Sequence, residues 1–206
     1  KRFFFGLSNY TLSENWIAYL SGKLIWKHFL AIVEPNDILK HQEGLCSQQT
    51  IVFMELLKRK SINVRSVGLG RKEGPGHFLC EAQYQHDWHL YDVTIEPLFE
   101  IPKLENRSAA YYLNNLDTFY KAYNGRVTRD VFNKYVEKVA YGEVNQFPAK
   151  NMLLFHQVTK LIAFLLPFLF IILFLISLAK ESHKRKNNLK EKGEEPEFTE
   201  AIEQLS

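Results

Sequence analysis

GLCSQQTIVFMELLKRKSINVRSVGLG, residues 44–70, is the stretch that decides the fold. It places Cys46, one of only two cysteines in the chain, directly before a run of polar residues, and helix-compatible apolar spacing follows from Ile51 to Leu57. A thiol at a helix N-terminus has a lowered pKa and is therefore a nucleophile. A cysteine there can equally be a small buried hydrophobic side chain. Position alone leaves both interpretations open.

Composition indicates a globular domain of ordinary size. The chain has 206 residues, of which 46% are hydrophobic and 14% aromatic, and its formal net charge is +3. So small a charge argues against a nucleic-acid-binding surface unless the charge is concentrated, and two cysteines are too few for a disulfide scaffold. The chain begins at Lys1 without an initiator methionine, so we expect an upstream segment to have been removed.

Residues 161–179, LIAFLLPFLFIILFLISLA, carry no charge. At a rise of about 1.5 Å per residue, a helix of this length crosses the hydrocarbon core of a bilayer. A buried core helix keeps a polar face, which this segment lacks, and Pro167 is tolerated within a membrane helix. The segment therefore predicts one transmembrane helix in contact with the lipid bilayer.

Basic residues flank this span unevenly. Only Lys150 and Lys160 stand nearby on its N-terminal side. The basic residues that follow it are Lys180, Lys184, Arg185, Lys186, Lys190 and Lys192. Because positive charge stays cytoplasmic, we expect a single-pass membrane protein with residues 1–150 outside the cytoplasm (periplasmic, extracellular or lumenal) and a cytoplasmic tail, 180–206. That tail is rich in Lys and Glu and is predicted to be disordered.

The part before the span predicts an α+β fold. Helical spacing of apolar residues is found at 10–33, at 46–60, and in two tyrosine-rich segments, 108–123 and 128–140. A break is expected at 34–37. Alternation or β-rich composition predicts three strands, at 62–68, 77–84 and 88–93. Because their connections are short, these strands should pair antiparallel.

The last two strands bring an imidazole and a carboxylate together. With a two-residue turn at 85–86, which we assume, Leu79 lies opposite Asp92. Because side chains alternate between faces, His77 and Asp92 then share a face as a diagonal pair roughly 7–8 Å apart, close enough for their side chains to meet. A one-residue slip would separate them. Cys80, three residues beyond His77, points to the opposite, buried face.

A cysteine at a helix start, a histidine to take its proton and an acid to orient the histidine form a complete nucleophilic apparatus. The helix dipole and a neighbouring imidazolium favour the thiolate of Cys46, and Asp92 would hold the tautomer of His77. Each residue alone has an ordinary structural explanation. Together they predict a catalytic triad of Cys46, His77 and Asp92.

Three blocks of this sequence resemble the core of the transglutaminase-like superfamily. They are the stretch quoted above, GHFLCEAQY at 76–84 and WHLYDVTIEP at 88–97. In that family a Gly-x-Cys begins a helix, a Gly-Ile-Pro-Ala-Arg type segment forms a strand, a His opens a second strand, and a Trp precedes Asp-Pro-Thr. The matching positions are Cys46, Ser61 to Arg65, His77, Trp88, and Asp92 to Thr94, within roughly residues 40–98.

The resemblance implies a papain-like fold, in which a helix bearing Cys packs on an antiparallel sheet bearing His and Asp. It also implies roles: Cys46 as nucleophile, His77 as general base and acid, and Asp92 as orienting carboxylate. Two departures are Val93, where the family often has proline, and Phe78, where a small residue often follows the histidine. Neither departure removes a chemical group.

An acyl-transfer site also needs donors for the oxyanion. The side-chain candidates are Gln42, Trp16 and Trp26, and the backbone N–H of Cys46 is a further candidate.

Two spacings of His and Cys residues bear on metal binding. The spacings His77-x-x-Cys80 and His86-x-x-His89 mimic those of zinc ligands. On strands, however, His77 and Cys80 point to opposite faces, and no acidic cluster has the spacing of a calcium loop. We therefore expect no metal and no cofactor.

Two functions remain open. The first is a membrane-anchored thiol acyl-transfer enzyme acting on a peptide or protein substrate outside the cytosol. It would be a cysteine protease or amidase, and so a hydrolase, if water resolves the thioester, and a transamidase if an amine does. The second is a catalytically idle binding or assembly module whose helix and tail contact membrane-protein partners. Neither involves nucleic acid, and the intact triad favours the enzyme.

Overall fold

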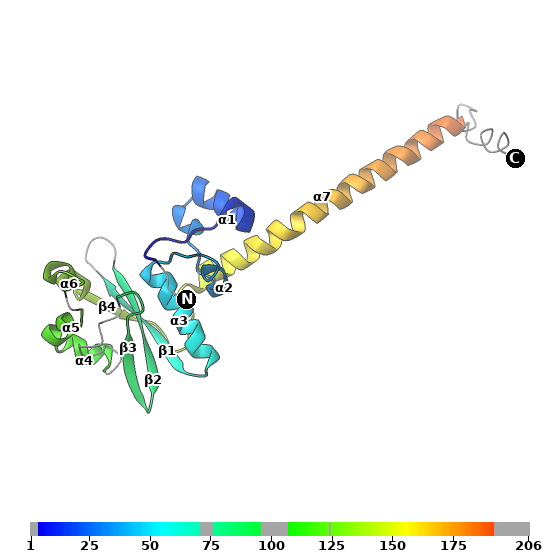
Figure 1. Ribbon diagram of the computed structural model, residues 1–206. Helices are drawn as coiled ribbons and strands as arrows, with labels where there is room; N and C mark the ends of the chain where they lie inside the picture. Colours follow the sequence, from blue (N-terminus) through cyan, green and yellow to red (C-terminus); the bar gives the residue numbers. More distant parts are fainter. Residues whose placement is uncertain (1–3, 71–75, 96–106, 124, 192–206) are drawn as a thin grey trace. The chain divides into compact units, whose positions relative to one another are not determined.

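The computed structural model describes residues 4–70, 76–95, 107–123 and 125–191. It divides the chain into two compact units, Lys1–Thr159 and Lys160–Ser206. Figure 1 labels most of the elements. Before the sheet come α1 (Leu12–Leu24), the 3₁₀ turn η1 (Lys27–Leu30), α2 (Pro35–Ile38) and α3 (Cys46–Arg59). The sheet and later elements are β1 (Asn63–Gly70), β2 (His77–Tyr84), β3 (Asp87–Tyr91), α4 (Ala109–Leu113), α5 (Leu116–Ala122), α6 (Arg129–Tyr135), β4 (Lys138–Tyr141) and α7 (Lys150–Glu191).

The first unit is built on a four-stranded antiparallel sheet with the order β3-β2-β1-β4. Helix α3 packs on one face, and α4, α5 and α6 lie on the other (Figure 1). Central strand β2 is buried at five of its eight positions because both faces are covered. Leu79 belongs to the core under α4–α6, and its neighbour Cys80 packs against Met54 of α3 and Val64 of β1. The predicted α+β class is confirmed.

An ion pair joins the two central strands on the face under α4. The Nε atom of Arg65 lies 2.7 Å from Oε2 of Glu81, whose side chain is fully buried. The other oxygen, Oε1, accepts the backbone N–H of Ala109 at 2.6 Å. A buried carboxylate needs such partners, and this one ties the start of α4 to the sheet.

Several predicted elements differ from the structure. The segment 10–33 holds α1 and the 3₁₀ turn η1, and the segment 108–123 holds α4 and α5, where one helix was expected in each. The segment 128–140 was expected to be one helix, but α6 ends at Tyr135 and a fourth strand, β4, follows. The apolar spacing fits a helix throughout, yet β4 pairs with the edge of β1, as in the partners Leu69 and Val139. The expected break at 34–37 instead holds the short helix α2, whose first residue is Pro35, a position where proline is favoured.

A third core cluster lies in the N-terminal part of the unit and includes the beginning of α7. Its buried members are Tyr10, Ala18, Ile32, Ile38, Ile51 and Val52, and Phe155 of α7 packs against them. His156 and Thr159, also in α7, are buried too. The compact unit therefore extends to Thr159, beyond the predicted boundary at residue 150.

The second unit contains the rest of α7. The helix is continuous to Glu191, and its segment Lys150–Asn188 is long and apolar enough to cross a membrane, with no buried residue in its most apolar stretch. The predicted disorder of the tail is corrected for residues 180–191, which are helical because they are rich in helix-forming Lys and Glu and contain no Gly or Pro. Residues 192–206 lie outside the described part of the chain.

Candidate active site

Cys46 is the first residue of α3, and Gln48 fixes the backbone around it. The buried Gln48 side chain accepts the N–H groups of Leu45 and Ser8 through Oε1, at 3.1 and 3.0 Å. Its Nε2 donates to the carbonyl oxygens of Ser8 and Ile32, at 2.7 and 2.8 Å. All the hydrogen-bonding capacity of this amide is used. The first turn of α3 is therefore locked onto the N-terminal segments.

A second tie joins α3 to the start of β2. The hydroxyl of Thr50 donates to the carbonyl oxygen of Phe78 at 3.0 Å. The backbone N–H groups of Phe78 and Ser47 both lower the pKa of the Cys46 thiol. The sulfur thus lies between a helix N-terminus and the first residues of the strand that carries His77.

The hairpin that carries His77 and Asp92 has the predicted register. Tyr84 pairs with Asp87, so the turn consists of Gln85 and His86 alone. Both turn residues have positive φ, 50° and 71°. Left-handed conformations at both positions are those of a type I′ turn, whose twist matches the twist of the strands. The assumed two-residue turn is confirmed.

The imidazole and the carboxylate meet as that register requires. Nε2 of His77 lies 2.6 Å from Oδ2 of Asp92, and both side chains are buried. Oδ1 of the carboxylate accepts the backbone N–H groups of Thr94 and Ile95, at 3.0 and 2.9 Å. The Tyr123 hydroxyl, at the end of α5, donates to Oδ2 at 3.1 Å. Four donors therefore hold Asp92 in one orientation.

His77 and Cys46 also act on each other, because each shifts the pKa of the other. Since Nε2 faces Asp92, Nδ1 is the ring nitrogen left for Cys46. The three predicted residues are therefore neighbours in one site, and His77 and Asp92 are joined by a hydrogen bond.

The electrostatics of the site favour a thiolate beside an imidazolium. Burial raises the pKa of the Cys46 thiol. This effect is outweighed by His77, through hydrogen bonding and charge, and by the backbone N–H groups of Phe78 and Ser47. The pKa of the thiol is therefore lowered overall. Burial lowers the pKa of His77, but hydrogen bonds with Asp92 and Cys46 and their charges raise it to about 10. This is the electrostatic pattern of an activated cysteine.

Water has unequal access to the members of the triad. The ring of Tyr135, from α6, stacks on the ring of His77 with centroids 5.5 Å apart. Asp92 is buried under Tyr123, whereas Cys46 is only partly buried. Cys46 is therefore the member of the three that is open to the surroundings, while His77 and Asp92 are shielded.

Cys80 provides an internal contrast. Its side chain is fully buried on the α3 face of the sheet, opposite to His77, as alternation predicted. Burial raises the pKa of the Cys80 thiol, and the negative charges of Asp92 and Glu81 raise it further. Both cysteines are free thiols.

The three side chains expected as oxyanion donors are not brought to the triad by any contact among the described residues. Gln42 is exposed, and its backbone carbonyl accepts the N–H of Phe4 at 2.9 Å. Trp26 contacts the rings of His28 and Phe29, and Trp16 lies half-buried on α1. The backbone N–H of Cys46, in the first turn of α3, is the candidate whose position fits.

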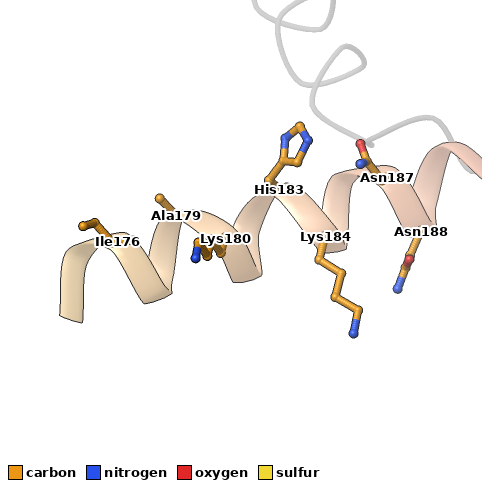
Figure 2. Close-up of a pocket in the computed structure, with 7 residues that line it drawn as sticks. All are labelled: Ile176, Ala179, Lys180, His183, Lys184, Asn187 and Asn188. Carbon is orange, nitrogen blue, oxygen red and sulfur yellow. The ribbon is translucent and has the colours of Figure 1, made fainter. Parts of the chain in front are cut away.

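The described residues contain no cluster of three or more His, Cys, Asp or Glu side chains that could hold a metal ion. The structure has a shallow hollow along one face of α7 in the second unit (Figure 2). It is lined by Ile176, Ala179, Lys180, His183, Lys184, Asn187 and Asn188. All seven are exposed and form one stripe along a single helix, so the hollow has no enclosing wall, and we assign no ligand to it.

Sequence reasoning missed the residues that support the triad. Gln48 stands at the third position of α3, where Gln commonly reaches back to the helix cap, and that spacing was a usable signal. Tyr123 and Tyr135 lie in the two tyrosine-rich segments, for which the sequence predicted helices and no role at the site. No local pattern distinguishes them from the neighbouring tyrosines, because their partners come from distant strands.

No protein-family model, curated protein or solved structure matches this chain.

Proposed function

We propose that this chain is a membrane-anchored thiol acyl-transfer enzyme of transglutaminase-like type, acting on peptide or amide bonds outside the cytoplasm. The observation that carries the proposal is the buried His77–Asp92 hydrogen bond, at 2.6 Å, beside a Cys46 thiol that shares opposite pKa shifts with His77. A lowered thiol pKa next to a raised imidazole pKa is what nucleophilic catalysis by cysteine requires. The sequence resemblance agrees with this assignment of roles.

In the first half-reaction the Cys46 thiolate attacks the carbonyl carbon of the substrate amide. The carbonyl π electrons move to oxygen, and the backbone N–H of Cys46 stabilises the charge. When the tetrahedral intermediate collapses, the C–N bond breaks and the leaving amine takes the Nδ1 proton of His77. The product is a thioester on Cys46.

In the second half-reaction a water molecule or an amine attacks the thioester carbonyl, and Nδ1 of His77 accepts its proton. The C–S bond then breaks, and the thiolate of Cys46 and the imidazolium of His77 are restored. Water gives a protease or amidase, and an amine gives a transamidase. We favour hydrolysis, because water is always present.

The reactivity of the two thiols tests the proposal without a known substrate. At pH 6 an ordinary thiol with a pKa of about 8.5 is almost wholly protonated. Iodoacetamide should therefore modify Cys46 well before Cys80 in the folded protein, as measured by peptide mass spectrometry, and His77→Ala should remove most of that advantage. Protection of Cys80, which is fully buried, reports in each sample that the protein is folded. If Cys46 reacts no faster than a free thiol, the idle binding or assembly module replaces the enzyme.

We also propose that α7 spans the membrane with its C-terminal end in the cytoplasm. The basic residues after the apolar stretch carry this orientation. In a Cys46→Ala background, Ser206→Cys should resist an impermeant maleimide in intact cells or spheroplasts. Lys121→Cys, at an exposed position of α5, should label. The reverse pattern would place residues 1–150 in the cytoplasm. It would thus contradict the proposal that the substrate lies outside the cytoplasm.

A further inference from the structure

Tyr135, the last residue of α6, covers one face of the imidazole of His77. The two rings are stacked, with centroids 5.5 Å apart and planes inclined by 26°. Stacked rings at this separation attract one another, and an aromatic face attracts a positively charged partner more strongly. His77 is 6% exposed, whereas Tyr135 is half-buried. The tyrosine ring thus packs directly on the imidazole of the candidate site.

The fold fixes the position of Tyr135 from both directions along the chain. Three residues earlier on α6, Phe132 is buried in the core between the sheet and α4–α6. Four residues later, Val139 of β4 pairs with Leu69 of β1, and Leu69 pairs on its other side with His77. Val139 and His77 therefore flank the same residue of the central strand. The core and the sheet together hold Tyr135 at His77.

Tyr135 also acts on the acid side of the site. Burial raises the pKa of the Tyr123 hydroxyl well above its usual value, and Asp92 and Tyr135 raise it further. The Tyr123 hydroxyl donates to Oδ2 of Asp92, which is the oxygen that faces His77. Tyr135 is therefore near enough to influence the groups that hold His77, as well as the ring itself.

The imidazole needs more than one contact to keep its plane. The χ2 torsion of histidine has a broad minimum, so the side chain alone selects no single ring orientation. The hydrogen bond with Asp92 restrains Nε2, which is one corner of the ring. An aromatic ring packed against the face restrains the plane, and the plane decides whether Nδ1 of His77 faces Cys46.

We propose that Tyr135 is a positioning residue for acyl transfer: its ring holds the plane of the His77 imidazole so that Nδ1 faces Cys46 while Nε2 faces Asp92. The inference rests on the proposed function and extends it to a residue outside the three sequence blocks that resemble the transglutaminase-like core. Tyr135 acts through His77 and takes no part in bond making.

The pH profile of Cys46 alkylation tests this role in the full chain. Tyr135→Phe keeps the ring, and Tyr135→Leu keeps apolar bulk without a ring. The rate of modification by iodoacetamide is followed by peptide mass spectrometry from about pH 5 to 9, a range that brackets an ordinary thiol pKa. We expect Tyr135→Phe to keep the midpoint of the unaltered chain. Tyr135→Leu should raise it by about half to one pH unit, which slows alkylation at pH 6 by about 3–10-fold.

Tyr120→Leu is the matched control. Tyr120 is half-buried like Tyr135, and its ring lies 5.4 Å from that of Phe132 in the same part of the core. We expect this variant to lose stability and to keep the midpoint. Cys80, which is fully buried, reports folding in each sample. If Cys80 becomes reactive in Tyr135→Leu, Tyr135→Met takes its place, because the flexible Met side chain fills irregular space.

Three results would overturn the role of Tyr135. The first is an unchanged midpoint in the folded variant that lacks the ring. The second is an equal shift in Tyr120→Leu, because general loosening of the core would then explain both. The third is an equal shift in Tyr135→Phe, which would assign the effect to the hydroxyl and not to the ring.

The unaltered chain separates this inference from the proposed function. If its Cys46 reacts rapidly at pH 6 and loss of the Tyr135 ring has no effect, only the role of Tyr135 fails. If its Cys46 reacts no faster than a free thiol, the proposed function fails and this inference fails with it.

Discussion

His77 turns Nε2 towards Asp92, at 2.6 Å, and so leaves Nδ1 for Cys46. In the neutral ring the proton then resides on Nε2, where the carboxylate accepts it, and Nδ1 keeps the lone pair that can take the thiol proton. The backbone N–H groups of Thr94 and Ile95 occupy the other carboxylate oxygen. Asp92 therefore sets both the orientation and the tautomer of the His77 imidazole.

Asp92→Asn should reverse that tautomer. The amide oxygen will face the N–H groups of Thr94 and Ile95, which directs the amide NH₂ at Nε2 of His77. A ring that accepts at Nε2 carries its proton on Nδ1 and cannot accept one from Cys46. We expect acyl transfer to fall by about 10³–10⁴-fold, and alkylation of Cys46 at pH 6 to slow.

Asp87→Asn, at the exposed start of β3, is the control. Unchanged alkylation in Asp92→Asn would show that Asp92 does not govern the thiol.

The pH dependence of stability should reveal the coupled pair. His77, with its pKa raised to about 10, contributes stability below its unfolded pKa of about 6.5 and loses it as pH rises towards 10. Cys46, with a lowered pKa, contributes above its unfolded pKa of about 8.5 and loses stability as pH falls. Between about pH 6.5 and 8.5 the two trends oppose each other.

The unfolding free energy of the unaltered protein should therefore vary less over that range than that of Cys46→Ala. In the variant only the His77 trend remains, so stability should decline as pH rises, with a slope of at most about 1.4 kcal/mol per pH unit. Denaturant unfolding at half-unit pH steps measures both curves. Parallel curves would indicate that the pKa of Cys46 is the same in the folded and unfolded states.

Several of these residues could be placed from the sequence because local rules constrain them. The hairpin register follows from a two-residue turn and side-chain alternation, and it brought His77 and Asp92 together. Cys46 is the first residue of α3 because apolar periodicity starts just beyond it. The apolar run in α7 needs only length and composition to be recognised.

Other features depend on contacts between distant segments. The four residues of β4 are too few to show a period, and their strand conformation comes from pairing with β1. Trp16 and Trp26 have the chemistry of oxyanion donors, but their positions depend on how α1 and η1 pack, which no local pattern reports. Tyr123 reaches Asp92 across a separation of 31 residues in the chain.

Tyr123→Phe should weaken both the fold and the site. Its hydroxyl donates to the same carboxylate oxygen that binds His77, and it is buried. Loss of a buried hydrogen bond to a charged group should cost about 1.5–3 kcal/mol of unfolding free energy. The looser carboxylate should also shift the pH midpoint of Cys46 alkylation upward. Tyr112→Phe, in the same core cluster, should lower stability without moving that midpoint. If both variants move it equally, Tyr123 has no specific link to the triad.

Phe155→Ala should show that the folded domain extends into α7. The Phe155 ring stacks on Phe29 at 4.4 Å and packs against the N-terminal core cluster. Removing a fully buried phenylalanine costs about 3–5 kcal/mol, and for this partly buried ring we expect about 2–3 kcal/mol. Leu154 precedes it on the same helix but is 60% exposed. Leu154→Ala should change stability by no more than about 0.5 kcal/mol.

The measurement is denaturant unfolding of the full chain in detergent, with the fluorescence of the domain as the signal. Because the variants differ by one position on one helix, lipid or detergent effects on α7 should be shared. A cost for Phe155→Ala alone therefore places the first turns of α7 inside the domain, whereas equal, small costs would restore the boundary at residue 150.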